Sequence, residues 1–273
     1  MNKKTLFIFC LTAILTLLPV LGYGGYISMV IQTTITASPQ KVEVEITLQN
    51  KGDEAAYKIY PELQLGSSEA KLSPQQKMAV NDSRQWSHAF SPEEAGLKLN
   101  GTYPLLITLH YHDSNMYPAS TPEIVLFEMV KAGKELPFES KIETSEVLDF
   151  GQVSLTLGNV LDRTLVGEVR VLLPIELTTE NNSSTFELQA NQTSQILFPI
   201  TNKGALPGSK YKIFSITEFN DSGRHYCVLV SDMISVKMPK DEDSFRFLMI
   251  GGGSLIILLL LLIVFWELRR REN

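Results

Sequence analysis

The sequence predicts an all-β protein with two tandem β-sandwiches and one C-terminal transmembrane helix. Between residues 25 and 246, apolar residues recur at every second position, and no window keeps the three- and four-residue spacing of a helix. Turns rich in Asn, Asp, Ser and Gly separate these runs. A final apolar stretch is long enough to span a bilayer. The length of 273 residues fits two modules, and a hydrophobic fraction of 44% excludes a wholly disordered chain.

The N-terminal residues 1–24 have the parts of a secretory signal peptide. Lys3 and Lys4 form the charged start, an apolar run covers residues 6–21, and small residues follow at a plausible cleavage site. Pro19 and the glycines after it favour cleavage. The alternative is a retained N-terminal anchor.

Four runs of alternating apolar and polar residues predict strands with one buried face. Short strands at this spacing, joined by polar turns, are typical of an antiparallel sandwich. The apolar positions are Val42, Val44, Ile46 and Leu48; Leu105, Ile107, Leu109 and Tyr111; Val153, Leu155 and Leu157; and Val169, Val171 and Leu173.

The two halves of this region resemble each other. Residues 46–53 align with residues 155–162, and residues 101–114 align with residues 208–222, at an offset of about 108 to 109. Chance similarity between β-rich segments is the alternative, but both order and offset are kept, which favours a duplicated module. We therefore expect a signal peptide (1–24), a first sandwich (25–132), a linker (133–145), a second sandwich (146–238), a juxtamembrane linker (239–246), a transmembrane helix (247–266) and a cytoplasmic basic tail (267–273).

Two patches carry a resemblance to a known family. Residues 48–56, Leu-Gln-Asn-Lys-Gly-Asp-Glu-Ala-Ala, resemble the turn of bacterial immunoglobulin-like modules of the cell-adhesion-related (CARDB-like) kind. Residues 99–103 resemble their Gly-x-Tyr entry to a late strand, where Tyr103 can hydrogen-bond back across the sandwich corner. The second module has Asn-Val-Leu at residues 159–161 in place of Asn-x-Gly. The resemblance implies two immunoglobulin-like sandwiches that serve recognition, adhesion or scaffolding and lack catalysis.

The C-terminal segment predicts the topology. Residues 247–266 contain no charge, and 20 residues at about 1.5 Å each match a hydrocarbon core of about 30 Å. Arg269, Arg270 and Arg271 follow and should stay cytoplasmic by the positive-inside rule. We expect a single-pass protein of the cell membrane whose N-terminal domains are extracytoplasmic.

Charge and cysteine content narrow the function further. The sequence pI near 5.4 argues against a nucleic-acid partner. Subtracting the five basic and two acidic residues of the terminal segments from the net charge of -6 leaves about -9 for the exported part. Without Cys10 of the signal peptide, Cys227 has no intramolecular partner, so we interpret it as a small buried hydrophobe. An intermolecular disulfide is the alternative.

The sequence shows no catalytic motif and predicts no cofactor. It contains no His-Glu-x-x-His, Cys-x-x-Cys, Gly-x-Ser-x-Gly or Gly-x-Gly-x-x-Gly. His110 and His112 lie two apart on a predicted strand and, with Asp113, are weak metal candidates for which the sequence supplies no further ligand. An exposed strand face beside a turn is the alternative.

The preferred hypothesis is a non-enzymatic, membrane-anchored protein that presents its two modules to a protein partner in the envelope or braces a membrane complex. The main alternative is carbohydrate or cell-wall binding, because sandwich lectins stack sugars on aromatic side chains. Candidate platforms are Trp86, Tyr111, Tyr117 and Tyr226. A metal carrier that uses the two histidines is a third hypothesis.

Overall fold

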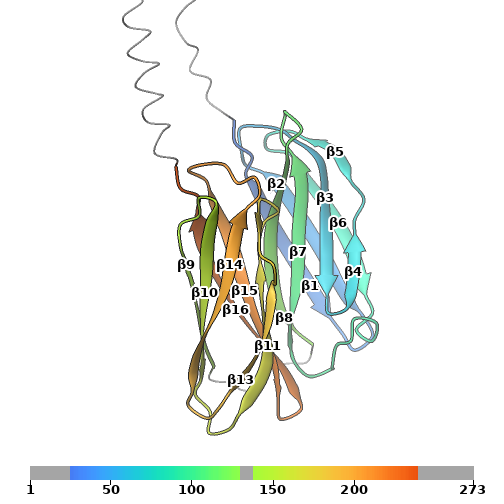
Figure 1. The fold of residues 1–273 in the computed structure, drawn as a ribbon. Helices are drawn as coiled ribbons and strands as arrows, with labels where there is room; N and C mark the ends of the chain where they lie inside the picture. Colours follow the sequence, from blue (N-terminus) through green and yellow to red (C-terminus); the bar gives the residue numbers. More distant parts are fainter. Residues whose placement is uncertain (1–24, 130–137, 239–273) are drawn as a thin grey trace, which may run out of the picture. The chain divides into compact units, whose positions relative to one another are not determined.

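The structure is a computed structural model that describes residues 25–129 and 138–238 (Figure 1). All regular secondary structure in these two ranges is β, in sixteen strands that pair antiparallel. None of the described residues belongs to a helix with the length and hydrophobicity needed to cross a membrane. The predicted signal peptide, transmembrane helix and arginine tail lie outside the described residues.

The first sandwich consists of two sheets whose strand order is immunoglobulin-like. One sheet has the order β1-β2-β6, and the other has the order β4-β3-β7-β8, with β5 also paired to β3. The bounds are β1 Met29–Ala37, β2 Val42–Asn50, β3 Ala56–Leu65, β4 Ser68–Lys71, β5 Gln75–Met78, β6 Ser83–Phe90, β7 Thr102–His112 and β8 Pro118–Glu128.

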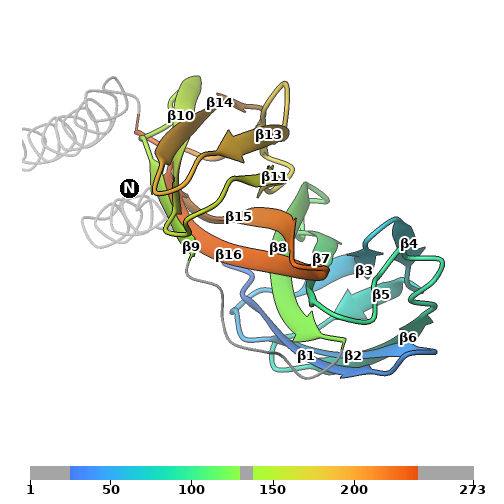
Figure 2. The same ribbon diagram turned by 90° about the horizontal axis from the view of Figure 1, so that it is seen from below.

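The second sandwich repeats this plan with the sheets β12-β14-β10-β9 and β13-β11-β15-β16. Figure 2 shows the layers from one end. The bounds are β9 Phe138–Thr144, β10 Phe150–Asn159, β11 Leu165–Leu172, β12 Leu177–Thr178, β13 Ser183–Leu188, β14 Thr193–Asn202, β15 Lys210–Asp221 and β16 Arg224–Ser235.

One predicted boundary is wrong. The segment assigned to the linker, 133–145, contains β9, which pairs with β10 along its whole length. The polar residues of Phe-Glu-Ser-Lys-Ile-Glu-Thr suggested a linker, but Ile142 is buried while Glu139 and Lys141 point outward. An edge strand with charged outward side chains therefore resembles a linker in composition.

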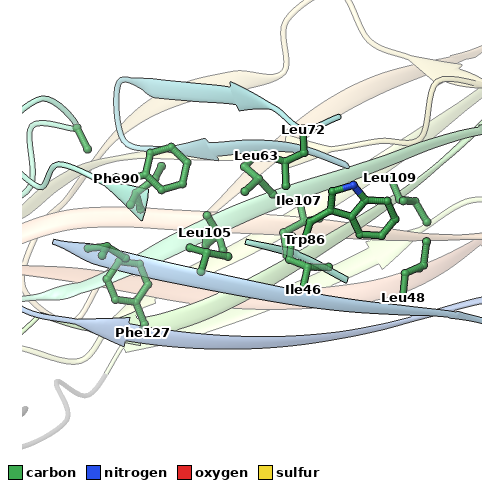
Figure 3. Packing of buried hydrophobic residues seen from close by; sticks show 14 of the residues in the cluster. Ile46, Leu48, Leu63, Leu72, Trp86, Phe90, Leu105, Ile107, Leu109 and Phe127 are labelled. Atoms are coloured by element: carbon green, nitrogen blue, oxygen red, sulfur yellow. The ribbon is translucent and has the colours of Figure 1, made fainter. Parts of the chain in front are cut away.

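Each sandwich has its own apolar core. In the first, the predicted alternation on β2 is confirmed, because Val42, Val44, Ile46 and Leu48 are buried. They lie in one cluster with Trp86 of β6, whose Nε1 donates to Ser73 O at 2.9 Å (Figure 3). In the second core, Val153, Leu155, Leu157, Val169 and Val171 are buried as predicted, and Leu173 lies at its edge.

Two buried asparagines confirm the alignment of the halves. Asn50 and Asn159 each end the second strand of their sandwich. Each accepts, through Oδ1, a hydrogen bond from the backbone amide two residues on, at 3.0 Å, and donates from Nδ2 to the carbonyl four residues on, at 2.7 Å. The same side chain thus closes the same turn twice. At Gly52 a Cβ would lie 2.2 Å from Tyr26 O, so the first turn requires glycine where the second turn has Leu161.

Two tyrosine corners repeat in the same way. The amide of Lys98 donates to Tyr103 Oη at 2.8 Å, and the amide of Leu206 donates to Tyr211 Oη at 3.4 Å. Each tyrosine stands five residues after its donor, at the start of β7 or β15. The predicted hydrogen bond across the corner is confirmed for Tyr103, and its equivalent occurs in the second sandwich.

The outward faces of two equivalent sheets pack on each other. Leu106 and Ile124 of the first sandwich form a cluster with Phe214, Ile216 and Cys227 of the second. We call this cluster the seam. Residues Gly25–Lys237 accordingly form one compact unit. β7 and β15 are buried on both faces over part of their length, which is why Leu106 interrupts the predicted alternation on β7.

Candidate interaction site at the seam

A groove of about 410 Å³ runs beside the seam, with one wall from each sandwich. The first sandwich contributes Glu62 of β3, Glu69 of β4 and Thr108 of β7; the second contributes Arg170 of β11 and Glu180 of the loop after β12. Three carboxylates therefore face a single guanidinium. The groove exists only while the two sandwiches are docked.

A part-buried ionic network fixes one side of this groove. Arg170 Nη2 donates to Glu218 Oε2 at 2.6 Å, and His225 Nε2 lies 3.1 Å from Glu218 Oε1. Burial alone would raise the pKa of Glu218, but the hydrogen bond to His225 and the charge of Arg170 outweigh it and hold the pKa below its ordinary value of 4.5. Glu218 is thus an anion at neutral pH with both oxygens engaged.

The same network reaches the first sandwich through His225. Its ring stacks on Tyr103, with centroids 4.4 Å apart and planes 7° from parallel. Its backbone amide donates to Asn100 O at 3.2 Å, beside a bridge between Gly101 and His225. A Cβ on Gly101 would lie 2.7 Å from His225 Cβ, so this crossing requires glycine. Tyr103 and His225 line a second hollow of about 220 Å³, together with Arg170 and Glu218.

A further contact closes the seam toward the other end of the strands. Ser120 Oγ of β8 accepts a hydrogen bond from the backbone amide of Ile175 at 2.9 Å; Ser120 is buried, whereas the Ile175 side chain is exposed. Glu176 follows, and burial raises the pKa of its carboxyl above the ordinary value. The two sandwiches are therefore joined at both ends of the seam by polar contacts and in the middle by apolar side chains.

The predicted metal candidates have separate structural roles. His110 Nε2 lies 3.0 Å from Glu62 Oε2, and its ring stacks on Tyr60 at 4.9 Å. Asp113 Oδ1 accepts the amides of Asn115 and Tyr117 and so shapes the β7–β8 turn. His112 Nδ1 is buried without a hydrogen-bond partner. Within the described ranges, no three His, Cys, Asp or Glu side chains gather as a metal site would require.

The aromatic candidates for sugar stacking are mostly engaged elsewhere. Trp86 lies in the first core, and Tyr226 stacks on Phe219 with centroids 5.5 Å apart. Tyr111 is half-buried and lies 3.5 Å from Thr121 through its hydroxyl. Of the four, only Tyr117 is largely exposed.

Cys227 lies in the seam as a buried apolar side chain, which confirms its interpretation. Burial raises the pKa of its thiol far above the ordinary value of 9.0. The ionic network, in contrast, was missed in the sequence. Arg170 and Glu218 each lie within a strand that also carries apolar residues, where a charge withdrawn from water needs a partner. This pattern could have indicated the pair.

Comparisons with known proteins give no identity. No family model matches the chain, and neither does any curated protein. Among solved structures, a red sea bream transglutaminase aligns at 7% identity over 77% of this chain and 31% of its own, with a TM-score of 0.26. The native Escherichia coli alpha-2-macroglobulin aligns at 12% identity over 78% and 17%, with a TM-score of 0.32. The YadV chaperone aligns at 12% identity over 75% and 99%, with a TM-score of 0.30.

This chain spans less than a third of the transglutaminase and of the macroglobulin. At such TM-scores the similarities carry no argument about function. The immunoglobulin-like assignment rests on this chain's own strand order and tyrosine corners.

Proposed function

We propose that this protein is a non-enzymatic, membrane-anchored interaction protein that presents two immunoglobulin-like sandwiches as one rigid body outside the cytoplasm. The observation that carries the proposal is the groove beside the seam. Its walls come from both sandwiches, and its shape is fixed by the Arg170–Glu218–His225 network and the apolar cluster. A preorganised groove of this kind lowers the ordering cost of binding.

The chemistry of the groove favours a basic segment of a partner protein. Glu69 and Glu180 contribute two carboxylates, whereas Glu62 lies against His110 and the charge of Arg170 is already paired with Glu218. An acidic exported part would also steer a basic partner toward it. The CARDB-like resemblance adds adhesion or the bracing of an envelope complex as the setting.

Membrane anchoring is the second part of the proposal. It is supported by the uncharged residues 247–266, the three arginines that follow and the signal-peptide pattern of residues 1–24. Carbohydrate binding is less well supported, because Trp86 lies in the core.

Site-specific photo-crosslinking in intact cells tests the groove. A photoreactive residue at Glu69 should give a discrete protein adduct, whereas the same residue at Glu43, on the outward face of β2 in the opposite sheet, should not. Glu180→Lys should abolish the Glu69 adduct, because it reverses a charge on the facing wall. Equal adducts from both positions, or no effect of Glu180→Lys, would overturn the assignment of the groove.

A further inference from the structure

Exposed apolar side chains gather at the end of the Gly25–Lys237 unit where the described chain begins and leaves. Each is between 43% and 75% exposed. They are Tyr26, Tyr117, Leu148, Phe150, Ile175 and Leu206, and we call them the apolar end.

On the first sandwich, hydrogen bonds hold the relevant loops together. The amide of Tyr26 donates to Asp53 Oδ1 at 2.6 Å. The amide of Ser114, in the β7–β8 turn that ends at Tyr117, donates to Glu54 Oε1 at 2.9 Å. Tyr26 and Tyr117 therefore belong to loops that meet at one end of the sandwich.

On the second sandwich, the loops around the chain exit are joined in the same manner. Asn202 Nδ2 donates to Leu148 O at 2.9 Å and to Ala205 O at 3.2 Å. The amide of Lys237 donates to Val147 O at 2.7 Å. Leu148 is thus bonded to Asn202 through its carbonyl, and Leu206 directly follows Ala205, which is bonded to Asn202 as well. Phe150 lies two residues after Leu148, at the start of β10.

The two halves of the apolar end are continuous. Ile175 donates its amide to Ser120 Oγ of the first sandwich, and Glu176 O accepts the amide of Lys203 in the loop that leads to Leu206. The six side chains consequently lie at one end of the Gly25–Lys237 unit, on hydrogen-bonded loops of both sandwiches.

The internal repeat provides a comparison for this surface. Leu206 donates its amide to the tyrosine corner of the second sandwich, and its equivalent in the first is Lys98. The alignment likewise places Lys41 at the position of Phe150. Both lysines lie at the end of the strands opposite to the apolar end. The Lys98 corner lies beside His225, at the start of β16, whereas the Leu206 corner lies beside Val236, just after the end of β16. The equivalent positions thus carry a lysine at one end and an exposed apolar side chain at the other.

We infer that the apolar end rests in the headgroup layer of a lipid bilayer. Tyrosine and phenylalanine side chains with exposed aliphatic neighbours are typical of a membrane–water interface. The inference rests on the membrane anchoring of the proposed function. Only residues 238–246 separate this end from the expected span, and nine residues reach at most about 32 Å even when fully extended. Because these residues connect the apolar end to the expected span, the bilayer stays close, and weak insertion of the apolar side chains is sufficient to keep them in contact with it.

The charges at this end define the lipid class. The loops of the apolar end carry both signs of charge: Lys51, Lys203 and Lys237 are basic, and Asp53, Glu54, Asp113 and Asp149 are acidic. Such a mixture gives no attraction to an anionic surface, since that needs clustered basic residues. The chemistry fits zwitterionic headgroups, and binding should depend little on salt.

The test uses the full-length protein in phosphatidylcholine vesicles, with an environment-sensitive fluorophore on Leu206→Cys. Lys98→Cys, at the equivalent corner, is the matched control. Lipids with a quencher near the headgroups should reduce the Leu206 signal at least threefold more than the Lys98 signal. The substitution Phe150→Lys should weaken this quenching, and 0.5 M salt should not.

Equal quenching at both positions in carbonate-resistant protein would overturn the inference and leave membrane anchoring intact. Extraction of the protein by carbonate would overturn the anchoring and the inference together. A fluorophore at Leu206→Cys that is shielded from water but not quenched by the lipids would overturn the bilayer assignment. A second copy of this chain or another protein would then cover the apolar end.

Discussion

Tyr103 and His225 stack face to face across the seam at a centroid distance of 4.4 Å. Tyr103 also closes the corner of its own sandwich through Lys98, and His225 also binds Glu218. One pair of rings therefore connects the tyrosine corner of the first sandwich to the ionic network of the second. The stability of each sandwich should depend on the other through this pair.

The substitution Tyr103→Phe separates the corner hydrogen bond from the ring stack. It should lower the free energy of unfolding by about 1 kcal/mol, because the amide of Lys98 loses its acceptor while the ring remains. Tyr211→Phe should cost less, since its hydrogen bond is longer at 3.4 Å. Denaturant titration of the purified variants measures both. A larger loss for Tyr211→Phe would contradict this ranking.

The substitution Glu218→Gln should lower the free energy of unfolding by about 2 kcal/mol at pH 7, because Arg170 loses a part-buried ionic partner. The native pKa of Glu218 lies below 4.5, so the wild-type carboxylate stabilises the fold above that pH, and this stabilisation is lost as the pH falls through the native pKa. Unfolding from pH 7 to pH 3 should therefore show the two proteins converging under acid. If the difference in the free energy of unfolding between the two proteins did not change with pH, the charge of Glu218 would be excluded as its source.

The substitution Gly101→Ala should destabilise the seam by about 1–3 kcal/mol, because the new methyl group would meet His225 Cβ at 2.7 Å and His225 O at 2.8 Å. Gly204→Ala is the control, since a Cβ there has no atom within 4 Å. Thermal unfolding should show a lower midpoint for the first variant and little change for the second. Equal midpoints would mean that the crossing tolerates a side chain.

The substitution Phe214→Ala should cost about 3–5 kcal/mol, because it removes the largest side chain of the seam cluster. Leu197→Ala, on an exposed position of β14, should change the free energy of unfolding by less than about 0.5 kcal/mol. The two variants can be compared by denaturant titration. A small effect at Phe214 would show that the cluster contributes little to stability.

The strands with one buried face could be predicted from the sequence, because alternation records burial directly. Val42 to Leu48 and Val153 to Leu157 are buried as expected, and the Tyr103 corner follows from residue type and position. β9 was missed because its outward face is charged. Leu106 and Phe214 are apolar where alternation predicts polar residues, and only the packing of one sandwich on the other explains them.

The candidate site was harder to predict from the sequence than the strands. Arg170 and Glu218 are 48 residues apart, and no local spacing indicates that they meet. His110 and His112 attracted attention by their spacing, yet His110 pairs with Glu62 from a neighbouring strand. A site assembled from two modules depends on long-range docking, which periodicity does not encode.

The central claim is that the two sandwiches form one rigid body with a fixed groove. A distance measurement between spin labels at Gln85→Cys of β6 and Gln195→Cys of β14 tests it most directly, because these positions lie on different sandwiches, away from the seam. We predict a single narrow distance distribution that broadens in Phe214→Ala. A broad distribution in the otherwise unaltered protein would show two independently moving sandwiches and would contradict the claim.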